Sequence, residues 1–227
     1  MQRLLLVVLA LAALVAAAPA ALAQDSDPMV AAYGDFASLT FKGTGSKTIA
    51  LPAGIRSGSL TLRDLGGGWV SADIPDHHAM QGLVAPDGLQ KLVGRSEGTT
   101  VFGVTGPGDP RKKLAILTET STVRWTVTIA PMRLLPVLAL PTTGTTSAAY
   151  RYTGPMTSAT ASIKATGASP CSGTFSMLTA DAANTSWRYL VTLGTCGQQP
   201  SAFSISGGTS TIIAVASQGY RWRFAAG

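Results

Sequence analysis

The densest group of side chains that could do acid–base or metal chemistry lies in residues 73–78, with the sequence DIPDHH. Carboxylates such as Asp73 and Asp76 and the imidazoles of His77 and His78 are ligand types that bind zinc. Adjacent side chains on an extended chain point in opposite directions, so two neighbouring histidines rarely share one ion. The prolines and glycine in and after this segment indicate a surface loop. We interpret residues 73–78 first as a solvated loop, and a metal-dependent or enzymatic role for them as the alternative.

Other arrangements for catalysis are excluded by residue type and order. No histidine follows His78, so a nucleophile later in the chain has no histidine after it of the kind that α/β-hydrolases use. Asp181 is the one acidic residue after position 135, which leaves no carboxylate pair there for glycoside hydrolysis. The motif LPTTG at 140–144 matches a sortase signal, but the 83 residues that follow it are too many for a sorting tail. The sequence therefore predicts a chain that is not an enzyme and needs no cofactor.

Arginine between aromatic residues is the second chemical pattern. Four arginines have an aromatic residue on each side, namely Arg151, Arg188, Arg221 and Arg223. If these segments are strands, the aromatic rings fill the core and the guanidinium groups lie on the opposite face. If the strands share one sheet, the four form a stripe whose planar donors suit carboxylate, sulfate or phosphate. In the alternative interpretation they only make an outer sheet face soluble, with their stems covering apolar neighbours.

Charge is distributed unequally along the chain. Residues 24–135 include eleven basic and ten acidic residues, whereas residues 136–227 include five basic residues and one acidic residue. The excess of positive charge favours an anionic partner for the second half. The candidate partners are an anionic polysaccharide, lipid headgroups or an envelope protein, and specific binding of nucleic acid is not expected.

The N-terminus has the three parts of a secretory signal. A basic residue at position 3 precedes an apolar segment, which ends in the small-residue sequence Ala21-Leu22-Ala23. Cleavage after Ala23 would deliver a secreted, periplasmic or envelope protein, and the alanine-rich signal is typical of bacteria. No later segment has 18 uninterrupted apolar residues, so no transmembrane segment is expected in the mature chain. An exported chain reaches an oxidising compartment, and its only two cysteines, Cys171 and Cys196, are therefore expected to form a disulfide.

The elements that must position these residues are short strands. The chain has 25 glycines and 13 prolines and only 12% charged residues, a composition of turns and strands that excludes coiled coils and α-solenoids. Turn residues separate apolar segments, which predicts about seven strands in each half. In the first half the expected strands are 39–41, 47–51, 59–63, 69–72, 99–104, 114–118 and 123–129, and a helical turn is expected only at 88–93.

The two halves resemble each other when the chain is compared with itself. A shift of 101 positions pairs 61–63 with 162–164, and a shift of 97 pairs 124–127 with 221–224, with the change of shift in a glycine- and proline-rich loop. We therefore predict an all-β chain of two tandem antiparallel β-sandwiches related by duplication. Their expected limits are 24–131 and 137–227, after a signal peptide at 1–23, with an extended, packed connector at 132–136. Trp125 and Trp222 are expected to be equivalent buried anchors.

Each half also resembles a family of exported modules. The segment LPAG at 51–54 and the final strand WTVTIAP at 125–131 are similar to small bacterial β-sandwich modules of the pre-peptidase C-terminal type. The resemblance covers residues 32–131 and, more loosely, 137–227. It implies a noncatalytic accessory or binding role and assigns no functional residue.

Overall fold

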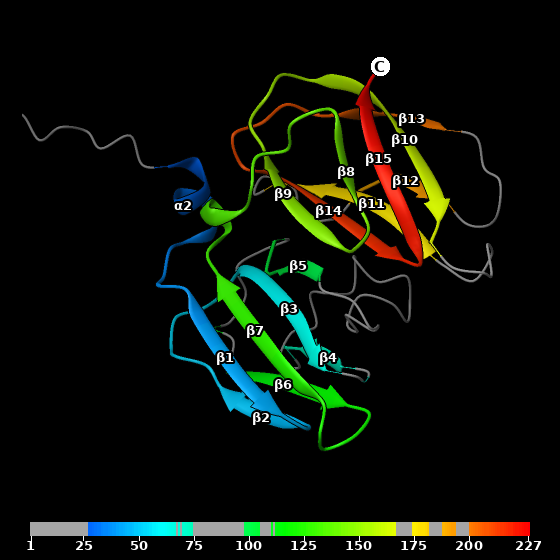
Figure 1. Ribbon diagram of the computed structural model, residues 1–227. Coiled ribbons are helices and arrows are strands. Elements are labelled where there is room, and N and C mark those ends of the chain that lie inside the picture. Colours follow the sequence, from blue (N-terminus) through cyan, green and yellow to red (C-terminus); the bar gives the residue numbers. More distant parts are fainter. Residues whose placement is uncertain are drawn as a thin grey trace, which may run out of the picture.

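The computed structural model describes residues 27–66, 68, 70–74, 98–104, 110, 112–166, 174–181, 188–193 and 200–227. Within these residues the chain is almost entirely β-structure, and every pairing between named strands is antiparallel (Figure 1). This confirms the all-β, sandwich-like fold class expected from the sequence. The expected signal peptide, the helical turn at 88–93, residues 75–78 and both cysteines lie outside the described residues.

The described part of the first half contains seven strands, as the turn spacing predicts. They are β1 (Leu39–Thr44), β2 (Lys47–Ala50), β3 (Gly58–Gly66), β4 (Val70–Asp73), β5 (Gly98–Phe102), β6 (Lys113–Thr118) and β7 (Arg124–Ala130). Four of them form a sheet in the order β1-β7-β3-β5, and the other three form a sheet in the order β2-β6-β4. Strand β7 shows why local pattern predicts these elements, since its buried Trp125, Val127 and Ile129 alternate with less buried residues.

The second half has eight strands in its described part. They are β8 (Thr142–Gly144), β9 (Ala148–Tyr152), β10 (Thr157–Ala165), β11 (Thr174–Ala180), β12 (Arg188–Leu193), β13 (Ser201–Ile205), β14 (Thr211–Gln218) and β15 (Tyr220–Ala226). They form two sheets, in the orders β13-β10-β15-β8 and β12-β11-β14-β9. The LPTTG motif occupies edge strand β8 and the turn before it, so this segment is part of the sheet.

The two halves have the same strand order in their front sheets. The order β1-β7-β3-β5 corresponds to β8-β15-β10-β13, with the final strand of each half second from one edge. In Figure 1 both sheets lie on the side nearer the viewer and follow the same order from left to right. The rear sheets correspond in the same way, because β2-β6-β4 matches β9-β14-β11 and β12 is additional.

The buried tryptophans expected as anchors make matching contacts in the two halves. Trp125 and Trp222 are 0% and 1% exposed. Trp125 lies opposite Gly43 on β1, and Trp222 lies opposite Gly144 on β8. In both places the ring lies against the glycine, so a methyl group there would be only 2.6 Å from Cζ2 of Trp125 or 2.2 Å from Cζ2 of Trp222. The prediction that both tryptophans are buried is confirmed.

Strand pairing corrects part of the sequence comparison between the halves. With Trp125 aligned to Trp222, Val127 corresponds to Phe224. Leu62 lies opposite Val127 and Ala161 lies opposite Phe224, so Leu62 corresponds to Ala161 and not to Ile163. The comparison by a constant shift of 101 is therefore wrong by two residues along this strand. An even error leaves every side chain on the correct face, so the alternation still predicts which residues face the core.

A short helix that the sequence analysis missed lies between the two halves. Helix α2 (Pro28–Tyr33) begins with an Asp27 side chain that accepts a hydrogen bond from the Met29 amide at 2.9 Å, and Pro28 occupies its first turn. This Asp-Pro pair is the local signal that could have predicted the helix. Its Met29 and Tyr33 side chains belong to a buried cluster shared by both halves.

The connector is packed, as expected, but its first part is not extended. Residues Met132–Leu134 form the 3₁₀ helix η2, and Met132 and Leu135 are 0% and 4% exposed. They join the same cluster as Val101 of the first half and Ile212 of the second. The amide of Thr99 also donates a hydrogen bond to the carbonyl of Ser147 at 2.9 Å, which links β5 to the segment before β9. The contact between the halves is thus both apolar and hydrogen-bonded.

None of the helices in the described ranges is long and apolar enough to cross a membrane.

Candidate functional site

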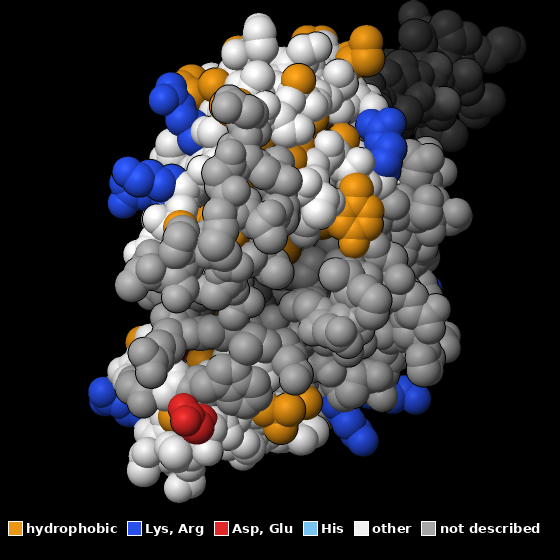
Figure 2. All heavy atoms as spheres, turned by 90° about the vertical axis from the view of Figure 1, so that its right-hand side faces the viewer, with side chains coloured by type: hydrophobic (Ala, Val, Ile, Leu, Met, Phe, Trp, Pro, Cys, Tyr) orange, Lys and Arg blue, Asp and Glu red, His pale blue; other side chains and the backbone are white. Residues whose placement is uncertain are grey.

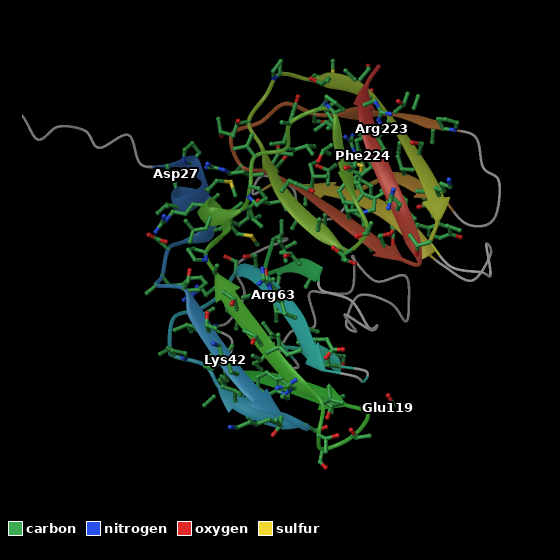
Figure 3. All side chains as sticks on the ribbon, viewed as in Figure 1. Asp27, Lys42, Arg63, Glu119, Arg223 and Phe224 are labelled. Atoms are coloured by element: carbon green, nitrogen blue, oxygen red, sulfur yellow. The ribbon has the colours of Figure 1, made fainter. Side chains whose placement is uncertain are left out.

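Strand β15 exposes two of the four arginines that the sequence analysis singled out. Tyr220, Trp222 and Phe224 are buried, and Arg221 and Arg223 between them are exposed. This is the period of two expected for a strand with one face on the core. Arg223 and Phe224 are labelled in Figure 3, on the front sheet of the second half. The strand therefore holds two guanidinium groups on one outer face, two residues apart.

Neighbouring strands add one cation and several hydroxyl groups to this face. On β10, Lys164 lies opposite Arg221 and Ser162 lies opposite Arg223, and on β8 Thr143 lies opposite Arg223. We call these five residues the second-half outer face. Lys164 was missed by the sequence analysis, which considered only arginines flanked by aromatic residues. The alternation 160, 162, 164 along the strand was the signal that could have found it.

The electrostatics of the second-half outer face are unfavourable for the folded chain on its own. Residues directly opposite on antiparallel strands have their Cβ atoms about 4.5 to 5.5 Å apart, and like charges in such a pair are destabilising. Lys164 and Arg221 form such a pair. Among the described residues, the ion pairs are Arg133 with Asp35 and Arg151 with Asp27, and neither involves this face. The one acidic residue in the sequence of the second half is Asp181, which follows β11 in the rear sheet.

Arg151 does not belong to this face, because its strand β9 is in the rear sheet. The guanidinium group lies 3.8 Å from the Asp27 carboxylate at the start of helix α2, and its Nε is buried without a hydrogen-bond partner. The backbone of Arg151 also binds the connector, donating to the Pro136 carbonyl at 2.9 Å and accepting from the Leu138 amide at 2.8 Å. Arg151 thus contacts the segments that join the halves.

Arg188 is also separate from the arginines of β15. It lies on β12, at the opposite edge of the rear sheet from Arg151, and is exposed. Its Nη2 donates a hydrogen bond to the Ser206 hydroxyl at 2.9 Å. The single stripe of four arginines expected from the sequence is therefore wrong. That stripe required the strands to share one sheet, and only Arg221 and Arg223 do so.

Most of the alternative site at residues 73–78 lies outside the described residues. The backbone of Asp73 ends strand β4 and Ile74 is buried in the first-half core, whereas Asp76, His77 and His78 lie outside the described residues. In the part of the chain that the structure describes, no group of three or more His, Cys, Asp or Glu residues is placed to hold a metal ion.

A polar cluster between the halves has a structural role. Tyr33 donates a hydrogen bond from its hydroxyl to the Ser210 carbonyl at 2.8 Å, and its own carbonyl accepts one from the Ser57 hydroxyl at 2.6 Å. Tyr33 thereby connects the second half to the first. Burial raises the pKa of Tyr33 well above its ordinary value, and the negative charge of Asp181 raises it further. The hydroxyl is therefore a neutral donor that fixes the contact.

Large exposed hydrophobic side chains are absent from the described residues of the strands that make the second-half outer face. The large exposed hydrophobic residues of the described part are Leu65, Leu117, Leu134, Val137, Met156 and Tyr189. None of these six lies on β8, β10, β13 or β15. The five residues of the face are therefore cations and residues with a hydroxyl group.

Comparison with known proteins identifies no family. No protein-family model matches the chain, and no curated protein matches it. Among solved structures, the chain is similar to the CUB1-EGF-CUB2 domain of human MASP-1/3, with 12% identity, a TM-score of 0.21 and coverage of 84% of this chain and 99% of that one. It is also similar to a chain of Sulfolobus Turreted Icosahedral Virus, with 7% identity, a TM-score of 0.21 and coverage of 83% and 89%.

Proposed function

We propose that this chain is an exported, noncatalytic binding protein whose second-half outer face recognises a linear acidic polysaccharide. The observation that carries the proposal is the pairing of Lys164 with Arg221 across two strands, with Arg223 beside them. Cations placed opposite each other lower stability when nothing lies between them. A bound carboxylate or sulfate removes this repulsion, so the unfavourable arrangement of the free protein favours binding of an anion.

The chemistry of the face supports a polysaccharide over the other polyanions. Guanidinium groups bind carboxylate or sulfate through two parallel hydrogen bonds. The hydroxyl groups of Thr143 and Ser162 lie on either side of Arg223 and can exchange hydrogen bonds with sugar hydroxyls. Aromatic surfaces strengthen the binding of unstacked nucleic acid bases, and apolar side chains strengthen insertion into a lipid bilayer. The large exposed hydrophobic residues of the described part lie outside β8, β10 and β15.

Export and internal duplication are part of the same proposal. The signal-like segment at 1–23 supports delivery to the envelope or the exterior, where acidic polysaccharides are found. The matching strand orders and the matching tryptophan–glycine contacts support an origin of the two halves by duplication.

The test measures binding of the exported protein to alginate and dextran sulfate, with neutral dextran for comparison. The variant Lys164→Gln/Arg221→Gln/Arg223→Gln removes the cations of the face. We expect this triple variant to bind both acidic polymers at least about tenfold more weakly at low salt. Binding by the parent should weaken as salt rises, because screening acts on exposed charges.

A control with the same net charge separates this site from charge alone. Arg56, Lys112 and Lys113 are exposed and lie away from the second-half outer face, so Arg56→Gln/Lys112→Gln/Lys113→Gln should bind nearly as the parent does. Equal losses in the two triple variants would overturn the site. Tighter binding to anionic vesicles or to DNA than to either polysaccharide would overturn the ligand class.

A further inference from the structure

The first half has an outer face with its own three cations. Lys42 on β1, Arg63 on β3 and Arg124 on β7 are all exposed, and Lys42 and Arg63 lie opposite Thr126 from its two sides. We call Lys42, Arg63, Arg124 and Thr126 the first-half outer face. Lys42 and Arg63 are labelled in Figure 3, on the front sheet of the first half. No described carboxylate forms an ion pair with any of these three cations.

Most cations of the two outer faces lie at corresponding or exchanged positions, and Lys164 is the exception, because the first half has Gly66 opposite Arg124 where the second half has Lys164 opposite Arg221. Arg124 precedes Trp125 as Arg221 precedes Trp222, so these two arginines correspond. In the next row across the sheet, the first half has Lys42, Thr126 and Arg63, where the second half has Thr143, Arg223 and Ser162. Cation and hydroxyl have exchanged places, and the row keeps both kinds of group in each half.

A row of threonines borders the cations of the first half. Thr40, Thr128, Thr61 and Thr99 lie in register across β1, β7, β3 and β5. Their hydroxyls hydrogen-bond in pairs, Thr40 with Thr128 at 3.1 Å and Thr61 with Thr99 at 2.9 Å. Neighbouring strands are about 4.8 Å apart, so the row is a regularly spaced array of hydroxyl groups on hydrogen-bonded strands. The first-half outer face is thus also rich in the groups that bind sugars.

Both outer faces look toward the same side of the molecule. The two front sheets lie on the side nearer the viewer in Figure 1. In Figure 2, Lys and Arg side chains project from the left-hand margin, which is that same side, in the upper and in the lower half, and others project from the right-hand margin. The halves are held together by the shared buried cluster and by the Tyr33–Ser210 hydrogen bond at 2.8 Å. A ligand that reaches from one face to the other therefore meets a preformed arrangement.

We infer that the first-half outer face is a second binding site, and that one acidic polysaccharide chain binds to both outer faces at once. The inference rests on the proposed function, because it assigns the same ligand class to a second set of residues. Two linked sites bind a long chain more tightly than either site alone, since the second contact is made at high effective concentration. A short oligosaccharide gains nothing from this and fills the two sites separately.

The test compares short and long alginate or dextran sulfate chains on the exported parent protein and on Lys42→Gln/Arg63→Gln. Neither side chain hydrogen-bonds to another described residue, so the double variant should fold as the parent does. For the parent we expect two short oligosaccharides per protein and at least about tenfold tighter binding of the long polymer. For the variant we expect one short oligosaccharide per protein, bound as tightly as the parent binds it at the second-half outer face. The long polymer should then bind no more tightly than the short one.

The outcomes separate this inference from the proposed function. If the parent binds neither polymer, the proposed function fails. If the parent binds but Lys42→Gln/Arg63→Gln keeps two short oligosaccharides and the full gain with length, only the second site is overturned. The control Lys112→Gln/Lys113→Gln, with two exposed lysines outside both faces, should keep the stoichiometry and the gain. A loss in this control equal to that of the variant would also overturn the second site.

Discussion

Trp125 and Trp222 occupy matching places in the two halves. Each ring lies against a glycine of the edge strand, and each indole nitrogen donates a hydrogen bond to the turn after that strand. The Trp125 Nε1 donates to the Gly45 carbonyl at 2.8 Å, and the Trp222 Nε1 donates to the Thr146 carbonyl at 2.9 Å. Each ring thus fills the core while its one polar atom is satisfied. The geometry requires a residue without a side chain at Gly43 and Gly144.

The first prediction concerns these glycines. In Gly43→Ala or Gly144→Ala the new methyl group would lie 2.6 Å or 2.2 Å from the tryptophan ring, so the ring or the edge strand must move. We expect each variant to lose about 1 to 3 kcal/mol of unfolding free energy, as overpacked cores do. Chemical denaturation measures this loss. In the control Gly66→Ala the nearest atom is 3.4 Å away on an exposed arginine, so a loss as large in the control would contradict the explanation.

The second prediction is a disulfide between Cys171 and Cys196. Cys171 lies three residues before β11 and Cys196 lies three residues after β12, and Phe175 pairs with Leu193 where these strand ends meet. The described strand ends that are nearest to the two cysteines in the sequence are therefore paired with each other. We expect Cys171→Ser/Cys196→Ser to lose about 3 to 4 kcal/mol of stability in the chain-entropy model. Alkylation of two thiols in the unreduced, exported protein, seen by intact mass, would refute the bridge.

The third prediction concerns Tyr33 and alkaline pH. The pKa of Tyr33 is raised above its ordinary 10.0, first by burial and then by Asp181. The folded chain therefore holds this proton more tightly than the unfolded chain does. Its contribution to stability is complete below pH 10 and falls as the pH rises above 10 toward the raised pKa.

Two variants test this contribution. Tyr33→Phe should lose about 1 kcal/mol near pH 7, since the Ser210 carbonyl loses its donor. It should also show a weaker fall in stability above pH 10 than the parent in denaturation curves. Tyr189→Phe removes the hydroxyl of an exposed tyrosine and should keep the parent's pH dependence. An unchanged alkaline slope in Tyr33→Phe would rule out the role assigned to its hydroxyl.

The fourth prediction is that the exported protein begins at Gln24. Cleavage after Ala23 follows from the apolar segment and the small residues before the cut. The mass of protein recovered from the envelope or the medium should lack residues 1–23. Recovery of the full-length chain there would show that the segment is retained, and a substitution of Ala21 by a large residue should slow cleavage if the site is correct.

Local pattern was enough to predict most of the strands and the direction of their side chains. The alternation along 123–129 and 220–224 predicts which residues face the core, and the structure confirms it with Trp125 and Trp222 buried. This works because a strand repeats every two residues, so each residue's face follows from its immediate neighbours. Helix α2 carried a local signal as well, in Asp27 and Pro28, and the sequence analysis overlooked it.

Tertiary structure alone decided which strands are neighbours, and this determined the candidate site. Arg151, Arg188 and Arg221 share the same aromatic surroundings in the sequence, yet β15 lies in the front sheet and β9 and β12 in the rear sheet. Lys164 lies opposite Arg221 although 56 positions separate them in the chain. Partner choice depends on packing between distant segments, and a side chain's own sequence neighbourhood carries no information about it. The sequence therefore determined which residues face outward, and the pairing of β10 with β15 determined which of them act together.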